Sequence, residues 1–389
     1  MALAQAFPPP ISGRREQTAT RIMFFAIGFA SGAWAPLVPF AKARVGAGDG
    51  ELGLLLLCVG LGSILAMPLA GAVAGRLGHR LVLTVAAGVT LLVFPLLAML
   101  SSAPGLAAAL FVFGVGVGSI DCVINMQAIV VERDSGRPLM SGFHALYSLG
   151  GIAGAGGLSA AFSIGVSPLG AALGVAAGLL LAAAGAWSGL LPRTDAPHGP
   201  AFAAPRGIVL LIALFCFVVF LTEGSALDWS AVLLRTTRRA TAGQAGLGYV
   251  AFAAAMTSGR LAGDWLVGHV GSIRTVAIGA LIAAAGVGAA ALAPGWIAPV
   301  IGYGLVGAGC SNVVPVLYSA LGRQTAMPES QAVPAVSVVG YAGLLAGPAA
   351  IGLVADRSSL AVALLGVAAM LLGVAAMARR LGGQAPPSP

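Results

Sequence analysis

Two acidic residues, Asp121 and Glu223, lie inside long apolar stretches of the sequence. An ionisable group at bilayer depth costs about 2.5–3.5 kcal/mol on insertion scales, so it usually faces the protein interior and serves a function. A carboxyl group that is protonated in one conformation and ionised in another can couple proton movement to a change of access. We interpret both residues as candidates for proton coupling, with a purely structural hydrogen bond as the alternative for Asp121.

Asp121 shares one face of a predicted helix over residues 105–131 with Gly114, Gly118 and Asn125, because these positions recur at the spacing of a helical turn. The glycines allow a neighbouring helix to approach closely. We therefore expect Asp121 and Asn125 to project into a central cavity.

The candidates for lining a substrate cavity are Trp34, Asn125, Tyr147, Asn312 and Tyr341. Trp34, Asn312 and Tyr341 stand at polar or proline-containing interruptions of predicted helices, and broken helices often line transporter cavities. Aromatic walls with a few amide and hydroxyl groups suit a sugar-like solute, because rings stack on it and amides bond its hydroxyls.

Charged residues near one end of the predicted helices are candidates for gating: Arg76, Arg80, His144, Arg260 and Asp264. Arg260 and Asp264 stand four residues apart, so we expect an ion pair on one helix face that closes an inward gate. His144 opens a predicted helix, where it forms either a structural hydrogen bond or a proton relay. An anionic substrate normally requires a basic residue in the cavity, and we assign Arg260 to gating instead.

The composition places the chain in a membrane. Of the 389 residues, 59% are hydrophobic and 8% are charged, whereas an ordinary soluble domain is roughly one quarter charged. The net charge of +8 does not indicate nucleic-acid binding, because the basic residues are scattered between apolar segments. The four cysteines show no CxxC spacing, so we expect neither a disulfide nor a metal site.

Motifs of enzymes and of cofactor sites are missing from the sequence, which contains no HExxH, GxSxG or P-loop lysine. The string GYGLVG over residues 302–307 fits a dinucleotide fingerprint by pattern, but no predicted strand precedes it. We interpret that string as a helix-packing segment. We therefore expect no cofactor and no enzymatic activity.

Apolar segments of about 20 or more residues, enough to cross the hydrocarbon at 1.5 Å per residue, occur along the whole chain. They run over residues 21–41, 51–74, 81–101, 105–131, 142–162, 168–191, 207–234, 246–268, 273–293, 296–321, 334–354 and 359–379. We therefore expect twelve spans in two six-helix halves, residues 21–191 and 207–379. A disordered tail over 1–20, a Pro-rich linker over 192–206 and a tail over 380–389 complete the predicted organisation.

The basic residues are distributed unequally between the two sides of this arrangement. With the N-terminus inside, the loops that hold Arg76, Arg133 and Arg323 face the cytoplasm, while Lys42 and Arg44 are among the few that face outward. This bias predicts that both termini and the central linker are cytoplasmic.

An internal repeat relates the two halves at an offset of 193 residues, the separation of Gly114 from Gly307. The same offset relates three further glycine pairs: Gly116 with Gly309, Gly150 with Gly343, and Gly154 with Gly347. The offset is close to half of the chain length and preserves helix order, so we expect duplication of a six-helix unit.

The loop GAVAGRLGHR over residues 71–80 resembles the G-x-L-A-D-R-x-G-R-R signature of the major facilitator superfamily (MFS). The matching positions are Gly71, Arg76, Gly78 and Arg80, whereas Gly75 replaces the acid of the signature and His79 replaces one of its basic residues. The strings DCVINMQAIVVERDSGRPLMSGFHALYSLGGIAG and TEGSALDWS are similar to a bacterial inner-membrane subfamily of unassigned substrate, distantly related to fucose-proton symporters. The resemblance implies an all-α membrane protein with the MFS fold in the inner membrane.

We therefore expect a monomeric secondary transporter that moves a small-molecule substrate by alternating access, coupled to protons and surrounded by membrane lipid. The missing Gly-Pro pair of drug antiporters in the predicted helix over 142–162 favours uptake of a sugar-like solute slightly. Export of amphipathic drug-like compounds and a non-transporting receptor or scaffold on the same fold are the open alternatives.

Overall fold

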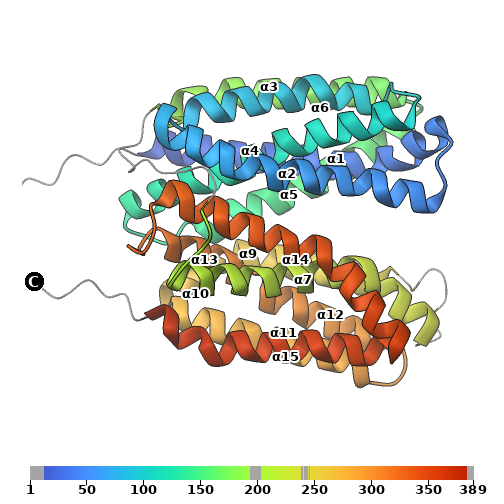
Figure 1. Ribbon diagram of the computed structural model, residues 1–389, viewed down its shortest axis with the longest axis vertical. Helices are drawn as coiled ribbons and strands as arrows, with labels where there is room; N and C mark the ends of the chain where they lie inside the picture. Colours follow the sequence, from blue (N-terminus) through green and yellow to red (C-terminus); the bar gives the residue numbers. More distant parts are fainter. Residues whose placement is uncertain (1–12, 193–202, 238–239, 241–243, 245, 383–389) are drawn as a thin grey trace, which may run out of the picture.

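The computed structural model describes residues 13–192, 203–237, 240, 244 and 246–382, and the secondary structure over these ranges is helical. Figure 1 shows two stacked layers of long helices whose axes are nearly parallel or antiparallel to one another. The first layer, called the N-bundle, comprises α1 (Arg14–Val45), α2 (Asp49–Leu77), α3 (His79–Leu97), α4 (Ala103–Ser135), α5 (Met140–Ser163) and α6 (Pro168–Ala186).

The second layer, called the C-bundle, follows in chain order. It comprises α7 (Ile208–Val232), α9 (Leu247–Leu261), α10 (Gly263–Val270), α11 (Ser272–Leu292), α12 (Ile297–Cys310), α13 (Val313–Leu321), α14 (Glu329–Arg357) and α15 (Leu360–Met377). Three short helices, η1 (Trp187–Gly189), η2 (Leu233–Thr237) and η3 (Ala378–Gly382), extend α6, α7 and α15. We call the end of the molecule at which α1 begins and α15 ends the termini end.

Over the ranges that the structure describes, eleven segments are long and apolar enough to cross a membrane. The expected span over residues 246–268 is divided into α9 and α10, which meet at Ala262 and are each too short to be counted alone. The helices α12 and α13 together make one span over residues 297–321 despite a break at Ser311 and Asn312. The all-helical membrane fold is confirmed, and the number twelve stays a prediction.

The first helix begins earlier than expected. It starts at Arg14 instead of residue 21, because Glu16 in the first turn accepts a hydrogen bond from the backbone N–H of Gly13 at 2.6 Å and thereby caps the helix. Residues 1–12 of the expected N-terminal tail, 193–202 of the expected linker and 383–389 of the expected C-terminal tail lie outside the described residues.

Equivalent glycines make equivalent contacts in the two bundles. Gly114 brings α4 against the backbone of Val59 on α2, and Gly307, at the repeat offset, brings α12 against the backbone of Phe252 on α9. A Cβ atom at either glycine would overlap the facing carbonyl oxygen. The repeat found in the sequence therefore recurs as a packing relationship, which supports duplication of the six-helix unit.

The same correspondence holds for the next pair of glycines. Gly150 lets α5 approach the backbone of Phe25 on α1, and Gly343 lets α14 approach the backbone of Phe217 on α7. These approaches fix the rotation of α5 and α14, the helices that carry Tyr147 and Tyr341.

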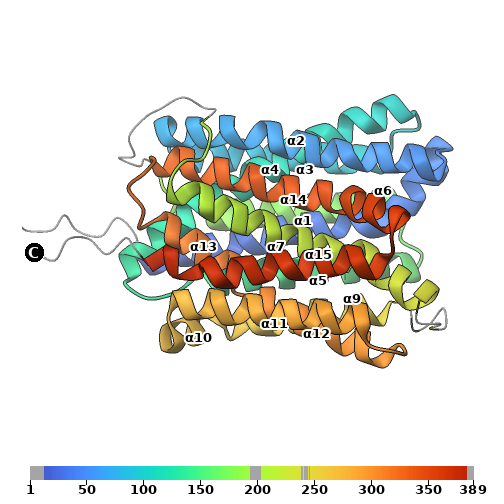
Figure 2. The same ribbon diagram turned by 60° about the horizontal axis from the view of Figure 1, so that its bottom comes forward.

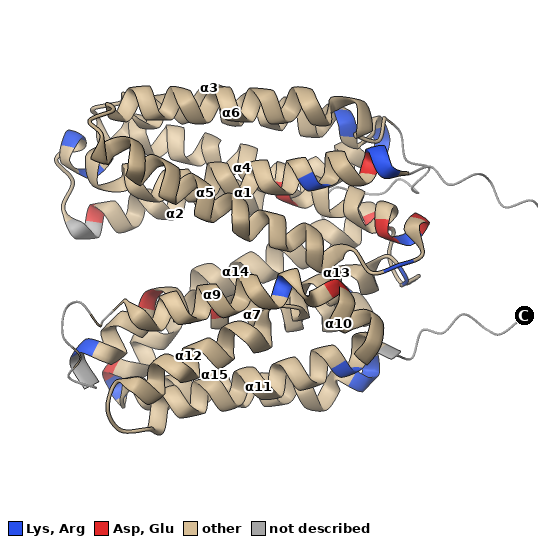
Figure 3. Ribbon diagram, turned by 180° about the vertical axis from the view of Figure 1, so that it is seen from behind, with Lys and Arg blue, Asp and Glu red and all other residues tan. Residues whose placement is uncertain are grey.

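The outer surface is apolar, as a bilayer requires. Leu92 on α3 is 72% exposed and Leu181 on α6 is 74% exposed, which would be costly against water but is favourable against lipid. Figure 3 shows that Lys, Arg, Asp and Glu gather mainly at the two ends of the molecule, with few charges between them. This distribution matches a bundle that spans a membrane lengthwise.

The two bundles meet along α2 with α14 and along α5 with α9, and Figure 2 shows α14 lying beside α2. At the termini end, Gly75 and Gly71 of α2 adjoin Ser330 and Pro334 of α14 so closely that an added Cβ would collide with them. The MFS signature has an acid at the position of Gly75. In this chain, the glycine at that position instead allows α2 to pack closely against α14.

Candidate functional site

A cavity of about 130 Å³ lies between the two bundles. Its lining comes from both of them and comprises Phe24, Asp121, His144, Tyr147, Phe220, Glu223, Arg260, Val314, Tyr341 and Leu344. Six of these ten residues were singled out from the sequence: Asp121, His144, Tyr147, Glu223, Arg260 and Tyr341. Helices α4 and α5 bring the first three, and α7, α9 and α14 bring the others.

The carboxylate of Asp121 joins the two bundles. The hydroxyl of Tyr341 on α14 donates a hydrogen bond to Oδ2 of Asp121 at 3.1 Å. On the other side, Nδ2 of Asn125 donates to the backbone oxygen of Asp121 at 2.9 Å and to its Oδ1 at 3.4 Å. Asp121 is therefore held in place from its own helix and from the C-bundle at once.

Glu223 pairs with Arg260 inside the C-bundle, with 3.6 Å between Oε1 and Nη2. Arg260 is only 7% exposed, and a buried guanidinium needs both a counter-charge and hydrogen-bond acceptors. Its Nη1 donates to Oγ of Ser148 on α5 at 2.9 Å, and its Nε lies 3.4 Å from the backbone oxygen of Ser311. Arg260 thus connects the acid of α7 with a hydroxyl of the N-bundle.

The ion pair expected between Arg260 and Asp264 does not form among the described residues. The helix that would place them on one face is interrupted at Ala262, between α9 and α10. Asp264 instead turns toward α5, where both of its carboxylate oxygens accept from the backbone N–H of Gly142 at 3.1 Å. The interruption lies where Gly263 contacts Ser141 of the N-bundle. Contact between the bundles therefore determines the partners of Arg260 and Asp264.

His144 faces the cavity from the first turns of α5. Its ring lies against Phe24, with 5.2 Å between centroids, and 6.0 Å from Tyr318. Its Nε2 is buried and has no hydrogen-bond partner among the residues that the structure describes. A nitrogen without a partner at this position has the geometry to form a hydrogen bond with a solute in the cavity.

Three of the expected substrate-cavity residues lie outside the cavity lining. Trp34 of α1 is buried in the hydrophobic core, and Asn125 is buried behind Asp121. Asn312 stands at the break between α12 and α13, where its Nδ2 donates to the backbone oxygen of Gly259 at 2.9 Å. The structure thus brings Tyr147 and Tyr341 to the cavity and places the two asparagines where they support its walls.

The two expected gating arginines of the α2–α3 turn lie at the termini end, away from the cavity. Arg76 is exposed in the last turn of α2. Arg80 donates to the backbone oxygen of Leu190 at 2.9 Å and lies over the ring of Trp187, so it binds within its own bundle. The bundles are linked at this end by other groups, including Arg133 and Glu329, with 3.8 Å between Nη1 and Oε2.

The structure adds residues that were not predicted from the sequence: Phe24, Phe220, Val314 and Leu344 in the lining, and Ser148 beside Arg260. The apolar members carry no signal that separates them from ordinary packing residues. The pairing of Arg260 had a usable signal, because a lone guanidinium inside an apolar span requires a buried acid, and Glu223 was available.

A bundle of membrane-spanning helices around a cavity with ionisable groups from both of its layers defines the class of multi-helix membrane transporters. An uncharacterized MFS-type transporter of Yersinia pestis is 50% identical to the chain over 360 residues, which cover 92% of this chain and 93% of the relative. The chain therefore belongs to the major facilitator superfamily, as the resemblance predicted, and it is a membrane transporter.

Solved structures agree in fold. A crystal structure of the Escherichia coli fucose:proton symporter FucP superposes with a TM-score of 0.74 at 19% identity, covering 94% of this chain and 98% of that one. The human organic anion transporter MFSD10 superposes with a TM-score of 0.72 at 15% identity, covering 96% and 100% of the two chains. No family model matches the sequence.

Proposed function

We propose that the protein moves a small polar solute across the bacterial inner membrane by alternating access, with proton movement coupled through Asp121 and Glu223. The proposal rests mainly on one observation: a single cavity contains both carboxylates, and both are connected to the opposite bundle. Asp121 of the N-bundle accepts a hydrogen bond from Tyr341 of the C-bundle. Glu223 of the C-bundle is paired with Arg260, which donates to Ser148 of the N-bundle. Movement of one bundle against the other has to break or remake these connections.

The charges of the cavity support coupling to a cation. When both carboxylates are ionised, Arg260 neutralises only one of them, so the cavity carries excess negative charge in an apolar surrounding. A proton on either acid removes that excess. Protonation of Glu223 would also release Arg260 from its ion pair, and protonation of Asp121 would change its hydrogen bond with Tyr341.

The size and lining of the cavity favour a small solute. Pockets for drug-sized ligands enclose roughly 300–1,000 Å³, whereas this cavity has about 130 Å³. The rings of Phe24, Tyr147, Phe220 and Tyr341 offer stacking surfaces, and the polar groups of the lining can bond hydroxyls. A sugar-like solute meets these requirements better than a large amphipathic compound. FucP, which has a similar fold, is a fucose:proton symporter.

A small organic anion is the second candidate solute, and it rests on one specific observation. The 3.6 Å between Arg260 and Glu223 exceeds the length of a charge-assisted hydrogen bond, which is about 2.7–2.9 Å. A carboxylate of a solute could therefore displace Glu223 from Arg260, and a proton taken up by Glu223 would compensate the exchange.

We propose that the termini end faces the cytoplasm, that residues 21–191 and 207–379 are the two moving halves, and that the protein acts as a monomer. The unequal distribution of basic residues and the equivalent glycine contacts of the two bundles support the first two points.

The test is solute-dependent proton movement into proteoliposomes that contain a pH-sensitive dye. Sugars, small carboxylates and amphipathic cations are screened with wild type, Asp121→Asn and Glu223→Gln, and the exposed Asp356→Asn serves as an isosteric control. We expect a sugar or a small carboxylate to move protons in wild type and in the control only. A protein that binds such a solute but moves neither solute nor protons would support the scaffold alternative.

A further inference from the structure

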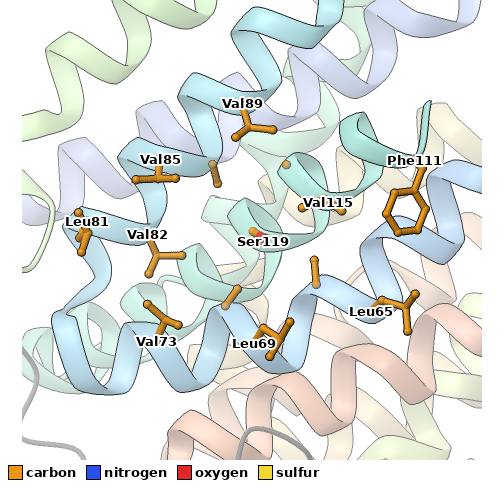
Figure 4. A pocket seen from close by; sticks show the side chains of 14 residues that line it. Leu65, Leu69, Val73, Leu81, Val82, Val85, Val89, Phe111, Val115 and Ser119 are labelled. Carbon is orange, nitrogen blue, oxygen red and sulfur yellow. The ribbon is translucent and has the colours of Figure 1, made fainter. Parts of the chain in front are cut away.

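A second hollow opens on the outer face of the N-bundle, between α2 and α3, with α4 as its floor. It encloses about 490 Å³ and is called the α2–α3 groove. Its lining comprises Leu65, Ala66, Leu69, Ala70, Val73, Leu81, Val82, Val85, Ala86, Val89, Phe111, Val115, Gly116 and Ser119. Figure 4 shows their side chains around the open space, with the Leu and Val side chains of α2 and α3 on its two sides.

The groove exists because small residues line the interior while large ones stand at its edge. Ala66, Ala70 and Ala86 are buried, and Gly116 on α4 adds no side chain to the floor. The edge residues face outward, for example Leu69, which is 52% exposed. The opening is therefore directed toward the hydrocarbon of the bilayer, not toward the cavity between the bundles.

The occupant has to be almost wholly apolar inside the groove. Among the fourteen lining residues, Ser119 alone has a polar side chain, and it is 8% exposed. A polar solute would leave its donors and acceptors unpaired there. From Leu65 to Arg76 the α2 side of the groove and its continuation extend over about 16 Å, at 1.5 Å per residue, which accommodates a stretch of an acyl chain.

A basic group stands at the mouth of the groove at the termini end. Arg76 follows Val73 and Leu69 by one and two helical turns, so it continues the groove face of α2. It is exposed and has no hydrogen-bond or ion-pair partner within the described parts of the chain. The ring of Trp187, 49% exposed and covered on one side by Arg80, lies at the same end, as expected at a membrane interface.

We propose that the α2–α3 groove binds an anionic phospholipid of the surrounding bilayer, with one acyl chain between α2 and α3 and the phosphate at Arg76. Apolar walls match the hydrocarbon, and the arginine matches the charge of the headgroup. The remaining face of α2 is already covered, because Gly60 and Gly71 adjoin Leu345 and Pro334 of α14. The site is independent of the transported solute.

The experiment uses the full chain in bilayers of phosphatidylcholine that contain a small fraction of a probe lipid with a photoreactive acyl chain. The probe has either a phosphatidylglycerol or a phosphatidylcholine headgroup, and labelled peptides are mapped by mass spectrometry. We expect the anionic probe to label α2, α3 and α4 around the groove about fivefold more than the neutral probe, the factor for one basic residue at an anionic surface.

Three variants make the result specific. Arg76→Gln should remove the preference for the anionic probe, whereas Arg274→Gln, an exposed arginine at the start of α11, should retain it. Ala66→Phe should fill the groove and abolish the labelling inside it. If Ala66→Phe does not fold, Val85→Trp at the exposed edge of the groove replaces it.

Equal labelling by both probes, or labelling spread evenly over all lipid-facing helices, would overturn the proposal. So would an anionic preference that persists in Arg76→Gln.

Discussion

Arg260 on α9 and Glu223 on α7 are paired inside the protein, with 3.6 Å between Nη2 and Oε1, and Arg260 is also bound to Ser148 of the opposite bundle. The pair is thus part of the contact between the two bundles. In the proposed mechanism, protonation of Glu223 would release Arg260 from this pair and so connect proton binding with the arrangement of the bundles.

The stability of the protein should show that the two charges depend on each other. Arg260→Met leaves Glu223 without its counter-charge, and we expect a loss of about 2 kcal/mol in the free energy of unfolding. The double variant Glu223→Gln with Arg260→Met should recover most of that loss, because it leaves no unpaired charge. Thermal unfolding in detergent is measured for wild type, both single variants and the double variant, which together form a double-mutant cycle. Additive effects of the two substitutions would refute the pairing.

Tyr341→Phe should weaken the function without disturbing the fold. It removes the hydroxyl that donates to Asp121, and a hydrogen bond to a charged group is worth about 1.5–3 kcal/mol, so we expect about a tenfold or larger fall in coupled flux. The matched control is Tyr303→Phe, since the hydroxyl of Tyr303 is buried and has no described partner. Similar losses in both variants would mean that the bond between Asp121 and Tyr341 has no special role.

Gly75→Asp should open the termini end. The added Cβ would lie 2.9 Å from Cβ of Ser330, and the carboxylate would need still more space between α2 and α14. We expect spin labels on these two helices near the termini end to move apart. Gly53→Ala, at an unobstructed position of the same α2 helix, should leave the distance unchanged. An unaltered distance in Gly75→Asp would show that the glycine contact does not hold this end closed.

Asp264→Ala should loosen the same end at a second place. It removes the acceptor of the Gly142 backbone N–H, which joins α10 to α5, and this should cost about 1 kcal/mol of stability. Faster hydrogen exchange of the first turn of α5 is the expected readout. Asp356→Ala, an exposed acid of α14, provides the comparison. Exchange that is equally slow in both variants would contradict the assigned contact.

Much of the fold could be predicted because the bilayer constrains composition so strongly. Long apolar segments, sparse charges and the MFS-like loop sufficed for an all-helical membrane transporter, and the repeat offset anticipated which glycines have equivalent contacts. The start of α1 was misplaced, because Glu16 caps the helix from within a polar stretch that has no hydrophobic signal.

The ionisable residues of the cavity could be singled out from the sequence, but their partners could not. Asp121 and Glu223 stand out because a charge in an apolar span is costly. The partners of Arg260 and Asp264 depend on the interruption at Ala262 and on the approach of α5, which are properties of the assembled bundles. Spacing along one helix therefore indicated a pair that the tertiary structure does not form.

The most direct test of the proposed coupling compares accumulation with exchange, once the screen has identified a solute. Proteoliposomes with an imposed pH gradient report accumulation, and equilibrated proteoliposomes with labelled solute on one side report exchange. We predict that Glu223→Gln or Asp121→Asn loses accumulation while exchange persists, because the bundles still alternate but no longer require a proton. Accumulation at the wild-type level in both variants would contradict coupling through these two carboxylates.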